Sequence, residues 1–262
     1  YYGKSDAADG ANPTGVWDSN FKAVWHLKET SGTQYDSTSN GNHGTPYNGV
    51  LQGVNAKING GDQFDGTDDY VRVPHSSSLL PDDGSGTGNG SWTISLWMKP
   101  PDSAQRGGVI GKRQNSSPYQ QYCLWIGGPT YVTLPPSKKL MFSYLQAHPS
   151  PRRVCYTVND VVDGQWHHIV AIANKSADKC FIFVDGVQAS TTDDNYGNWP
   201  VITLTEPVLL GNNGYQYAYY NGLLDEVRLT NGVRSAAWIK AEYHAGNGTL
   251  LSVGSEEQQT TV

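Results

Sequence analysis

The sequence predicts an all-β protein, a sandwich of two antiparallel sheets. Two observations predict it. The chain contains about a dozen short runs rich in β-branched and aromatic residues, each bounded by turn residues. The 262 residues also include 30 Gly, 14 Pro and 16 Tyr while only 16% are charged, which suits many strands joined by turns and does not suit a helix bundle.

The clearest pair of strands is a hairpin over residues 166–172 and 180–184. Residues of even and odd number face opposite sides of a strand, and in both runs the two sides are largely apolar. We therefore expect this hairpin to lie within a sheet that has something packed on each face. Asp185-Gly186 then predicts a tight turn, because Gly allows the positive φ that such turns require.

The other elements follow in chain order. A hairpin over residues 63–74 turns at Asp65-Gly66, and a clear alternation of apolar and polar residues predicts the strand 91–100. Ser235 predicts the start of the only plausible helix, which passes Trp238 and Tyr243 and ends at Gly246. Further strands are predicted at residues 23–27, 109–112, 122–126, 140–145, 207–211 and 220–229.

The predicted domain organisation is simple. Residues 1–20 are expected to be a linker, or the end of a preceding domain, residues 21–250 to be one β domain, and residues 251–262 to be a polar tail. Because the chain starts at Tyr1 and not at Met, we expect it to be a piece of a longer polypeptide, with any export signal outside the given sequence. No apolar run approaches the length of a membrane span.

The charge and the cysteine content give no sign of a nucleic-acid-binding protein or of a cysteine metal site. The net charge of −6, with scattered Lys and Arg, provides no basic stripe for nucleic acid. Cys123, Cys155 and Cys180 are odd in number and have no metal-like spacing, so at most one internal disulfide can form. All three lie in strand-like runs, where a small buried hydrophobic residue is the expected role.

Nine sequence motifs follow one another in a characteristic order. They lie at residues 23–27, 36–44, 64–66, 69–71, 92–100, 164–169, 184–186, 210–211 and 221–227. This order resembles the concanavalin A-like, laminin-G-like jelly rolls of microbial secreted and surface proteins, and the nine motifs together make the resemblance strong. It covers roughly residues 21–246 and implies a jelly-roll β-sandwich of two antiparallel sheets in an extracellular or cell-surface protein.

The loop 36–44 is a candidate calcium site. It combines Asp, Asn and His with Gly, and calcium prefers carboxylate, amide and carbonyl oxygens. From the residues alone, a loop whose side chains satisfy its own backbone is the better interpretation. The family resemblance implies a structural calcium, with His43 using its carbonyl because imidazole prefers softer metals. The implied ligands are Asp36, Asn40, Asn42, His43 and Asp225.

The sequence does not support catalysis. His167 and His168 are adjacent on a strand and therefore face opposite sides, so they cannot act on one substrate. Related glucanases place three acids at alternate positions of one strand, and residues 223–227 lack that arrangement. A glycosidase needs two carboxylates that flank the glycosidic bond to be cleaved. We therefore predict that the chain is not an enzyme.

Loop aromatic residues suggest the function. Flat rings beside amides are what a sugar-binding site requires, and the candidates are Tyr196, Trp199, Asn212 and Tyr215. Together with the resemblance, they predict a carbohydrate-binding, lectin-like or adhesion module of a larger extracellular protein, with a glycan or polysaccharide as partner. A protein-binding or spacer domain is the alternative, and a polysaccharide-degrading enzyme is the third and least favoured possibility.

Overall fold

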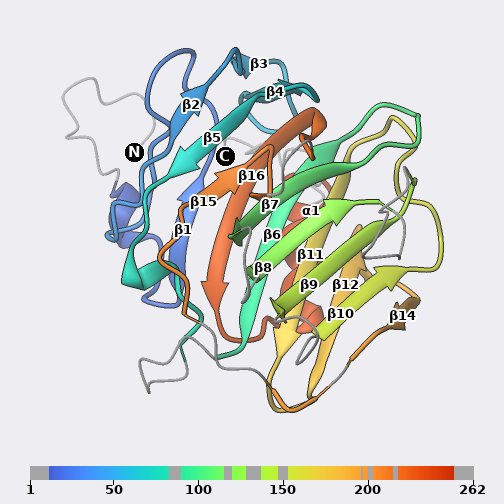
Figure 1. Ribbon diagram of the computed structural model, residues 1–262. Helices are drawn as coiled ribbons and strands as arrows, with labels where there is room; N and C mark the ends of the chain where they lie inside the picture. Colours follow the sequence, from blue (N-terminus) through green and yellow to red (C-terminus); the bar gives the residue numbers. More distant parts are fainter. Residues whose placement is uncertain are drawn as a thin grey trace, which may run out of the picture.

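The computed structural model is a sandwich of two eight-stranded antiparallel sheets with one α-helix on its outside (Figure 1). It describes residues 12–82, 90–114, 120–127, 137–146, 153–195, 197–199, 203–214 and 218–250. Nearly all of the regular structure in these residues is β, so the predicted all-β class and the two-sheet sandwich are confirmed.

The first sheet, called sheet I, has the order β13-β12-β11-β6-β16-β4-β3, and β1 also pairs with β16. Its middle is formed by the long strands β6, β11 and β16. The strands are β1 (Phe21–Trp25), β3 (Leu51–Val54), β4 (Gly61–Asp65), β6 (Trp92–Lys99), β11 (His167–Asn174), β12 (Lys179–Val184), β13 (Val187–Gln188) and β16 (Asn221–Asn231).

The second sheet, called sheet II, has the order β14-β10-β9-β8-β7-β15-β5-β2. The many neighbours that are distant in the sequence, such as β5 beside β15, are typical of a jelly roll. The strands are β2 (Thr45–Tyr47), β5 (Tyr70–Val73), β7 (Gly107–Arg113), β8 (Gln120–Ile126), β9 (Leu140–Gln146), β10 (Arg153–Thr157), β14 (Thr191–Asp193) and β15 (Val208–Leu210).

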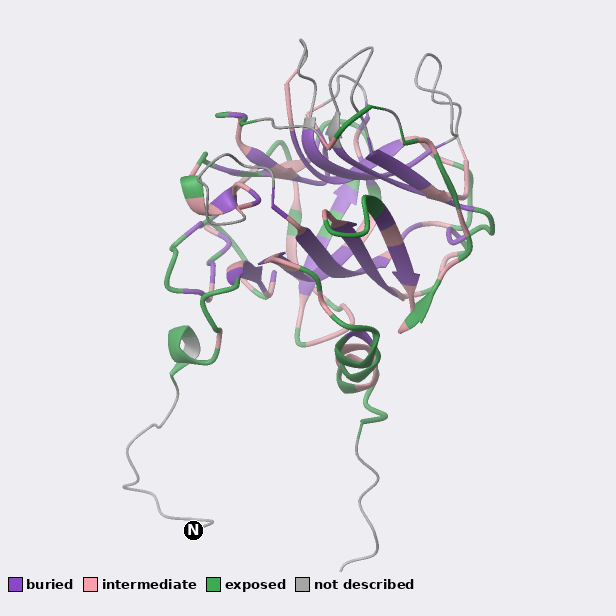
Figure 2. Cartoon of the chain, turned by 90° about the horizontal axis from the view of Figure 1, so that it is seen from below, coloured by how far each residue is buried: buried purple, intermediate pink, exposed green. Residues whose placement is uncertain are grey.

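Helix α1 (Ala236–Gly246) packs on the outer face of sheet I. Ser235 caps it by accepting a hydrogen bond from the backbone N–H of Trp238, as the sequence predicts. Two short 3-10 helices, η1 (Pro13–Gly15) and η2 (Ser77–Leu79), complete the structure. Both η1 and α1 lie on the same side of the sandwich (Figure 2). Among the described residues, no helix has the length and apolar character needed to cross a membrane.

The main core lies between the two sheets and is filled by large apolar side chains such as Trp25, Trp92 and Phe142. The inward face of the predicted hairpin, now β11 and β12, contributes Ile169 to this core. Its other face packs on Ile239 of α1, so the prediction of apolar packing on both sides is confirmed. Because both faces are buried, the sequences of these two strands are nearly continuous hydrophobic runs.

The three cysteines are buried and free of disulfides in the structure. Cys155 of β10 and Cys180 of β12 come from different sheets and belong to the same core cluster, where their thiols lie in contact. Cys123 of β8 instead donates a weak hydrogen bond to the carbonyl of Asn213. The expected role of a small buried hydrophobic residue is therefore confirmed for all three.

Candidate functional site

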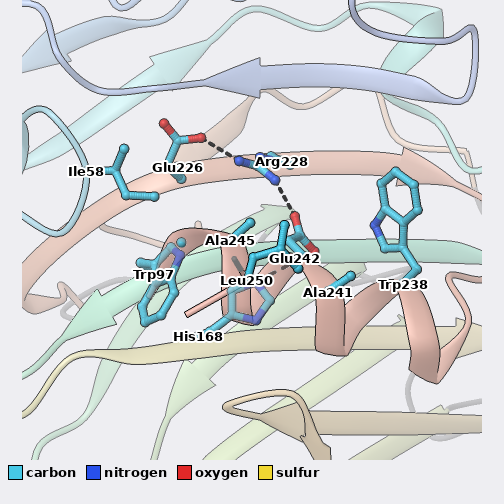
Figure 3. Close-up of a pocket in the computed structure, with 11 residues that line it drawn as sticks. Ile58, Trp97, His168, Glu226, Arg228, Trp238, Ala241, Glu242, Ala245 and Leu250 are labelled. Atoms are coloured by element: carbon cyan, nitrogen blue, oxygen red, sulfur yellow. Dashed lines mark hydrogen bonds and ion pairs between the residues drawn. The ribbon is translucent and has the colours of Figure 1, made fainter. Parts of the chain in front are cut away.

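A cavity of about 410 Å³ lies between α1 and the outer face of sheet I (Figure 3). This volume is within the range of small-molecule sites. The lining combines two tryptophans with a group of charged side chains, and Trp238 lies at the opposite end from Ile58. The remaining lining residues are Trp97, His168, Glu226, Arg228, Ala241, Glu242, Ala245, Gly246 and Leu250.

Strand alternation explains why these side chains point outward. On β6 the residues that flank Trp97, Leu96 and Met98, belong to the inner core, so Trp97 faces the helix side. A bulge in β16 interrupts its pairing with β6 between Asp225 and Arg228. Glu226 sits in this bulge with a φ of 51°, an unusual conformation for a residue with a Cβ. Bulges commonly redirect a side chain near a functional site, and this one brings Glu226 to the cavity.

The charged residues form one connected network. Arg228 Nη2 donates to Glu226 Oε2 at 2.6 Å, and Arg228 Nη1 donates to Glu242 Oε1 (Figure 3). His26 Nδ1 lies 2.6 Å from Glu226 Oε1, and Ser95 Oγ donates to Glu242 Oε1 at 3.0 Å. The network thus joins β6, β16 and the residue that follows β1 to the helix, and it fixes the carboxylates in the wall of the cavity.

The electrostatics of this network disfavour Glu226 as a catalytic acid. Burial raises the pKa of Glu226, but the hydrogen bond from His26 and the charge of Arg228 outweigh it and hold the pKa below its ordinary value. A general acid of a glycosidase requires the opposite, a raised pKa. Burial also lowers the pKa of His168, so its imidazole is neutral at pH 7.

Two buried polar atoms of the network have no partner among the described residues, Arg228 Nε and His168 Nδ1. Buried donors without a partner are costly, and a ligand with oxygen acceptors removes that cost. The Nδ1 atom acts as a donor only when the proton is on it, whereas Nε of arginine is always a donor. The cavity therefore offers a stacking surface together with hydrogen-bonding groups.

The loop at residues 36–44 is held by its own hydrogen bonds. Asp36 Oδ1 accepts from the N–H groups of Val24 and Thr38, and Asp36 Oδ2 accepts from Thr38 Oγ1 and the N–H of Asn42. These bonds use all four lone-pair positions of the carboxylate. Asp36 therefore fastens the loop to β1, and its carboxylate has no lone pair left for a cation.

The other predicted metal ligands make hydrogen bonds of their own. The Asp36 N–H donates to His43 Nδ1 at 3.0 Å, and Asn40 and Asn42 both donate to the carbonyl of Lys22. The loop carbonyl of Asn42 accepts from Trp25 Nε1. Asp225 instead accepts from the N–H of Ile58 at 2.6 Å, through its Oδ2 atom.

The predicted sugar-binding residues fall in several places. Trp199 packs on the main core, with its ring 5.4 Å from that of Tyr144, and the guanidinium of Arg153 lies 5.7 Å from the centre of the Trp199 ring. Asn212 is buried, and its Oδ1 accepts from the N–H of Gly214 in a tight turn. Tyr196 and Tyr215 lie outside the described residues.

The cavity residues Trp97, Trp238, Arg228 and Glu242 were not predicted from the sequence. Trp238 and Glu242 are four residues apart on the predicted helix, so they share one face of it. That spacing was the available signal, but nothing in the sequence shows that this face covers the strands that carry Trp97 and Arg228.

A family model places the chain among known proteins. A family model for laminin-G-like domains of the "Concanavalin A-like lectin/glucanases superfamily" matches residues 65–240. A comparison with curated protein sequences gives no significant match.

Solved structures with a similar fold include two binding domains. The binding domain of Paraclostridial Mosquitocidal Protein 1 has a TM-score of 0.65 at 11% identity and matches 86% of this chain. The binding domain of botulinum neurotoxin DC in complex with rat synaptotagmin II has a TM-score of 0.62 at 13% identity and matches 87%. This chain spans only 52% of each of these two proteins.

A third structure is matched over nearly its whole length. It is domain 4 of AbnA, an extracellular arabinanase from Geobacillus stearothermophilus, in complex with arabinotriose. Its TM-score is 0.51 at 16% identity, and the match covers 84% of this chain and 97% of that domain. At such low identities these three likenesses show the fold.

Proposed function

Because the chain belongs to the laminin-G-like group of the concanavalin A-like lectin/glucanase superfamily, we propose that it is a non-catalytic carbohydrate-binding module of a larger extracellular protein. The cavity between α1 and sheet I is the proposed binding site. The observation that carries the proposal is the chemistry of its lining. Two tryptophan rings stand beside two carboxylates and a guanidinium, which combines sugar stacking with hydrogen bonding to hydroxyls.

The neighbouring structures support this proposal. Domain 4 of AbnA is described in complex with arabinotriose, and a botulinum neurotoxin DC binding domain in complex with SialylT. A third neighbour comes from botulinum neurotoxin type C, whose cell entry is described as dependent on interaction with two ganglioside molecules. Different proteins that share this fold are therefore described with glycans as ligands.

A protein-binding module is the second candidate. Exposed apolar side chains occur in helix α1 and in the chain just before and after it, namely Val233, Trp238 and Leu250, which are 46%, 44% and 52% exposed. Such groups are common where a protein partner docks. One neighbour is also described in complex with a protein, rat synaptotagmin II.

The test is a glycan and polysaccharide array with the purified protein, run in the presence of calcium. Trp238→Ala should weaken binding of any selected glycan about tenfold or more, roughly 1.4 kcal/mol. Because Trp238 is nearly half exposed, its removal should leave the fold intact. Tyr47→Ala is the matched control, since Tyr47 is a comparably exposed aromatic residue on β2 of sheet II.

Each outcome of the array decides between the alternatives. Binding that is lost in Trp238→Ala and kept in Tyr47→Ala supports the cavity. Loss in Tyr215→Ala with full binding by Trp238→Ala would move the site to the predicted loop aromatics. A blank array from folded protein would contradict the glycan proposal and favour a protein partner, and cleavage of a bound polysaccharide would contradict the non-catalytic assignment.

A further inference from the structure

Cys155 and Cys180 face each other across the core of the sandwich. Cys155 is the central residue of β10 in sheet II, and Cys180 is the second residue of β12 in sheet I. Both are buried members of the inner core cluster, and the side chain of Cys180 interacts directly with the Cys155 thiol. Both are free cysteines in this structure, so the contact is between two thiols.

The pairing of the strands independently directs these two side chains inward. On β10, Cys155 pairs with Phe142 of β9, which belongs to the inner core. On β12, Cys180 pairs with Ala173 of β11, which belongs to the same core. Residues that pair directly on neighbouring strands point to the same face of a sheet, so each cysteine points toward the opposite sheet. The backbone therefore agrees with the contact between the thiols.

The two strands also approach each other closely. Stacked sheets are commonly about 10 Å apart, whereas Cα atoms of β10 and β12 come within 8 Å of one another (Figure 1). Each strand is the second from the end of its sheet, beside the short strands β14 and β13. The Cα atoms of a disulfide are usually about 4.4–6.8 Å apart, so a bridge between these strands requires only a small movement of the backbone.

Cys123 cannot take part in this bridge. On β8 it alternates with Tyr122 and Leu124, which both belong to the inner core, so Cys123 points to the outer face of sheet II. Its Sγ lies 3.8 Å from the carbonyl oxygen of Asn213. Cys123 is thus turned away from the other two cysteines, and only one of the three possible pairings remains.

We propose that Cys155 and Cys180 form a disulfide that joins the two sheets when the chain folds in an oxidising environment. The two thiols lose two electrons and two protons, and one S–S bond forms. A small-molecule disulfide such as oxidised glutathione takes up both electrons. One cysteine thiolate attacks it and forms a mixed disulfide, and the other cysteine then displaces the bound glutathione. Two glutathione thiols leave with the two protons.

Burial decides when this bridge can form. It holds the pKa of the Cys155 thiol well above its ordinary value, and the hydrogen bond with Cys180 adds to the effect. Because the thiolate is the form that attacks a disulfide, both thiols are protected from exchange once the core has closed. We therefore expect the bridge to form during folding. The closed core then shields the finished disulfide from reductants.

The experiment refolds the denatured and reduced chain in a glutathione redox buffer, blocks free thiols and digests the product with trypsin without reduction. Cleavage after Lys and Arg leaves the three cysteines in separate peptides, residues 114–138, 154–175 and 180–228. We expect the second and third peptides to be joined in the mass spectrum and the first to be free. Thiol titration of the unfolded product should find one free thiol instead of three.

The bridge should also stabilise the fold. Because it constrains residues 155–180 in the unfolded chain, the oxidised wild type should melt roughly 5–10 °C above the same protein in dithiothreitol. Cys155→Ala and Cys180→Ala should lose both the joined peptides and this difference in melting temperature. Cys123→Ala removes an equally buried cysteine and should keep both, so it is the matched control.

Three outcomes would overturn the proposal. They are three free thiols in the refolded wild type, a bridge that includes Cys123, and a bridge between Cys155 and Cys180 that leaves the melting temperature unchanged or lower. The peptide map uses the wild type, so it decides the pairing even if a variant does not fold. An extracellular location belongs to the proposed function, but the refolding test uses neither that location nor a glycan, so its result is independent of the proposed function.

Discussion

At the scale of single residues, His167 shows how a predicted structural histidine is used. Its Nδ1 lies 2.8 Å from Asp185 Oδ2, and its Nε2 lies 3.0 Å from Asp163 Oδ1. The hydrogen bond to Asp185, followed by that to Asp163, raises the pKa of His167 above its ordinary value in spite of burial. The protonated ring thus ties the start of β11 to the turn after β12.

This raised pKa predicts a pH-dependent stability. A histidine whose pKa is higher in the folded state stabilises that state fully at pH values below its unfolded pKa of about 6.5. This stabilisation is lost as the pH rises through the pKa of the folded state. We therefore expect the stability difference between wild type and His167→Gln to be largest near pH 5.5 and to shrink toward pH 8.5. Urea denaturation at several pH values measures it, and a difference that grows with pH would contradict the prediction.

Residue roles were the least predictable part of the molecule. The sequence shows Asp36 and Asp225 as possible metal ligands. It does not show that the Asp36 carboxylate accepts four hydrogen bonds, or that Asp225 Oδ1 has no partner among the described residues. Trp199 looked like a loop aromatic and packs on the core. Whether an oxygen or a ring is already occupied depends on residues far away in the chain.

At the scale of elements, helix α1 was predictable because its signals are local. Ser235 at the start and Gly246 at the end are independent of the rest of the fold, and the structure has them at those positions. The short strands β2, β3, β13 and β14 were missed, as was β10. Strands of two to five residues have too few positions to show an alternation, and pairing with a distant neighbour defines them.

The cap of α1 is a testable part of the cavity wall. Ser235→Ala removes the acceptor for the N–H of Trp238, and we expect it to destabilise the protein by about 1 kcal/mol. Ser235→Asp, which retains an acceptor at the same position, should be close to wild type. Chemical denaturation of the three proteins measures the differences, and equal stability of the Ala and Asp variants would show that the cap contributes nothing.

At the scale of the whole molecule, the sandwich followed from composition and pattern, but the cavity did not. Period-two patterns indicate which residues face a core, and the inner faces of β6 and β11 agree with them. The cavity depends on the helix lying over β6, β11 and β16. That placement comes from tertiary packing of Ile239 on Val170 and Phe183, which has no signature in any single segment.

The pairing of β1 with β16 also decides how the domain responds to force. Phe21, where β1 begins, lies opposite Thr230, close to where β16 ends. A pull applied at these two points acts across the strands and opens their hydrogen bonds one at a time, instead of shearing them together. In single-molecule stretching from residues 12 and 250, we expect a low peak for the release of β1, and a high shear-type first peak would contradict this. As a tether the domain would then yield early and lengthen in steps.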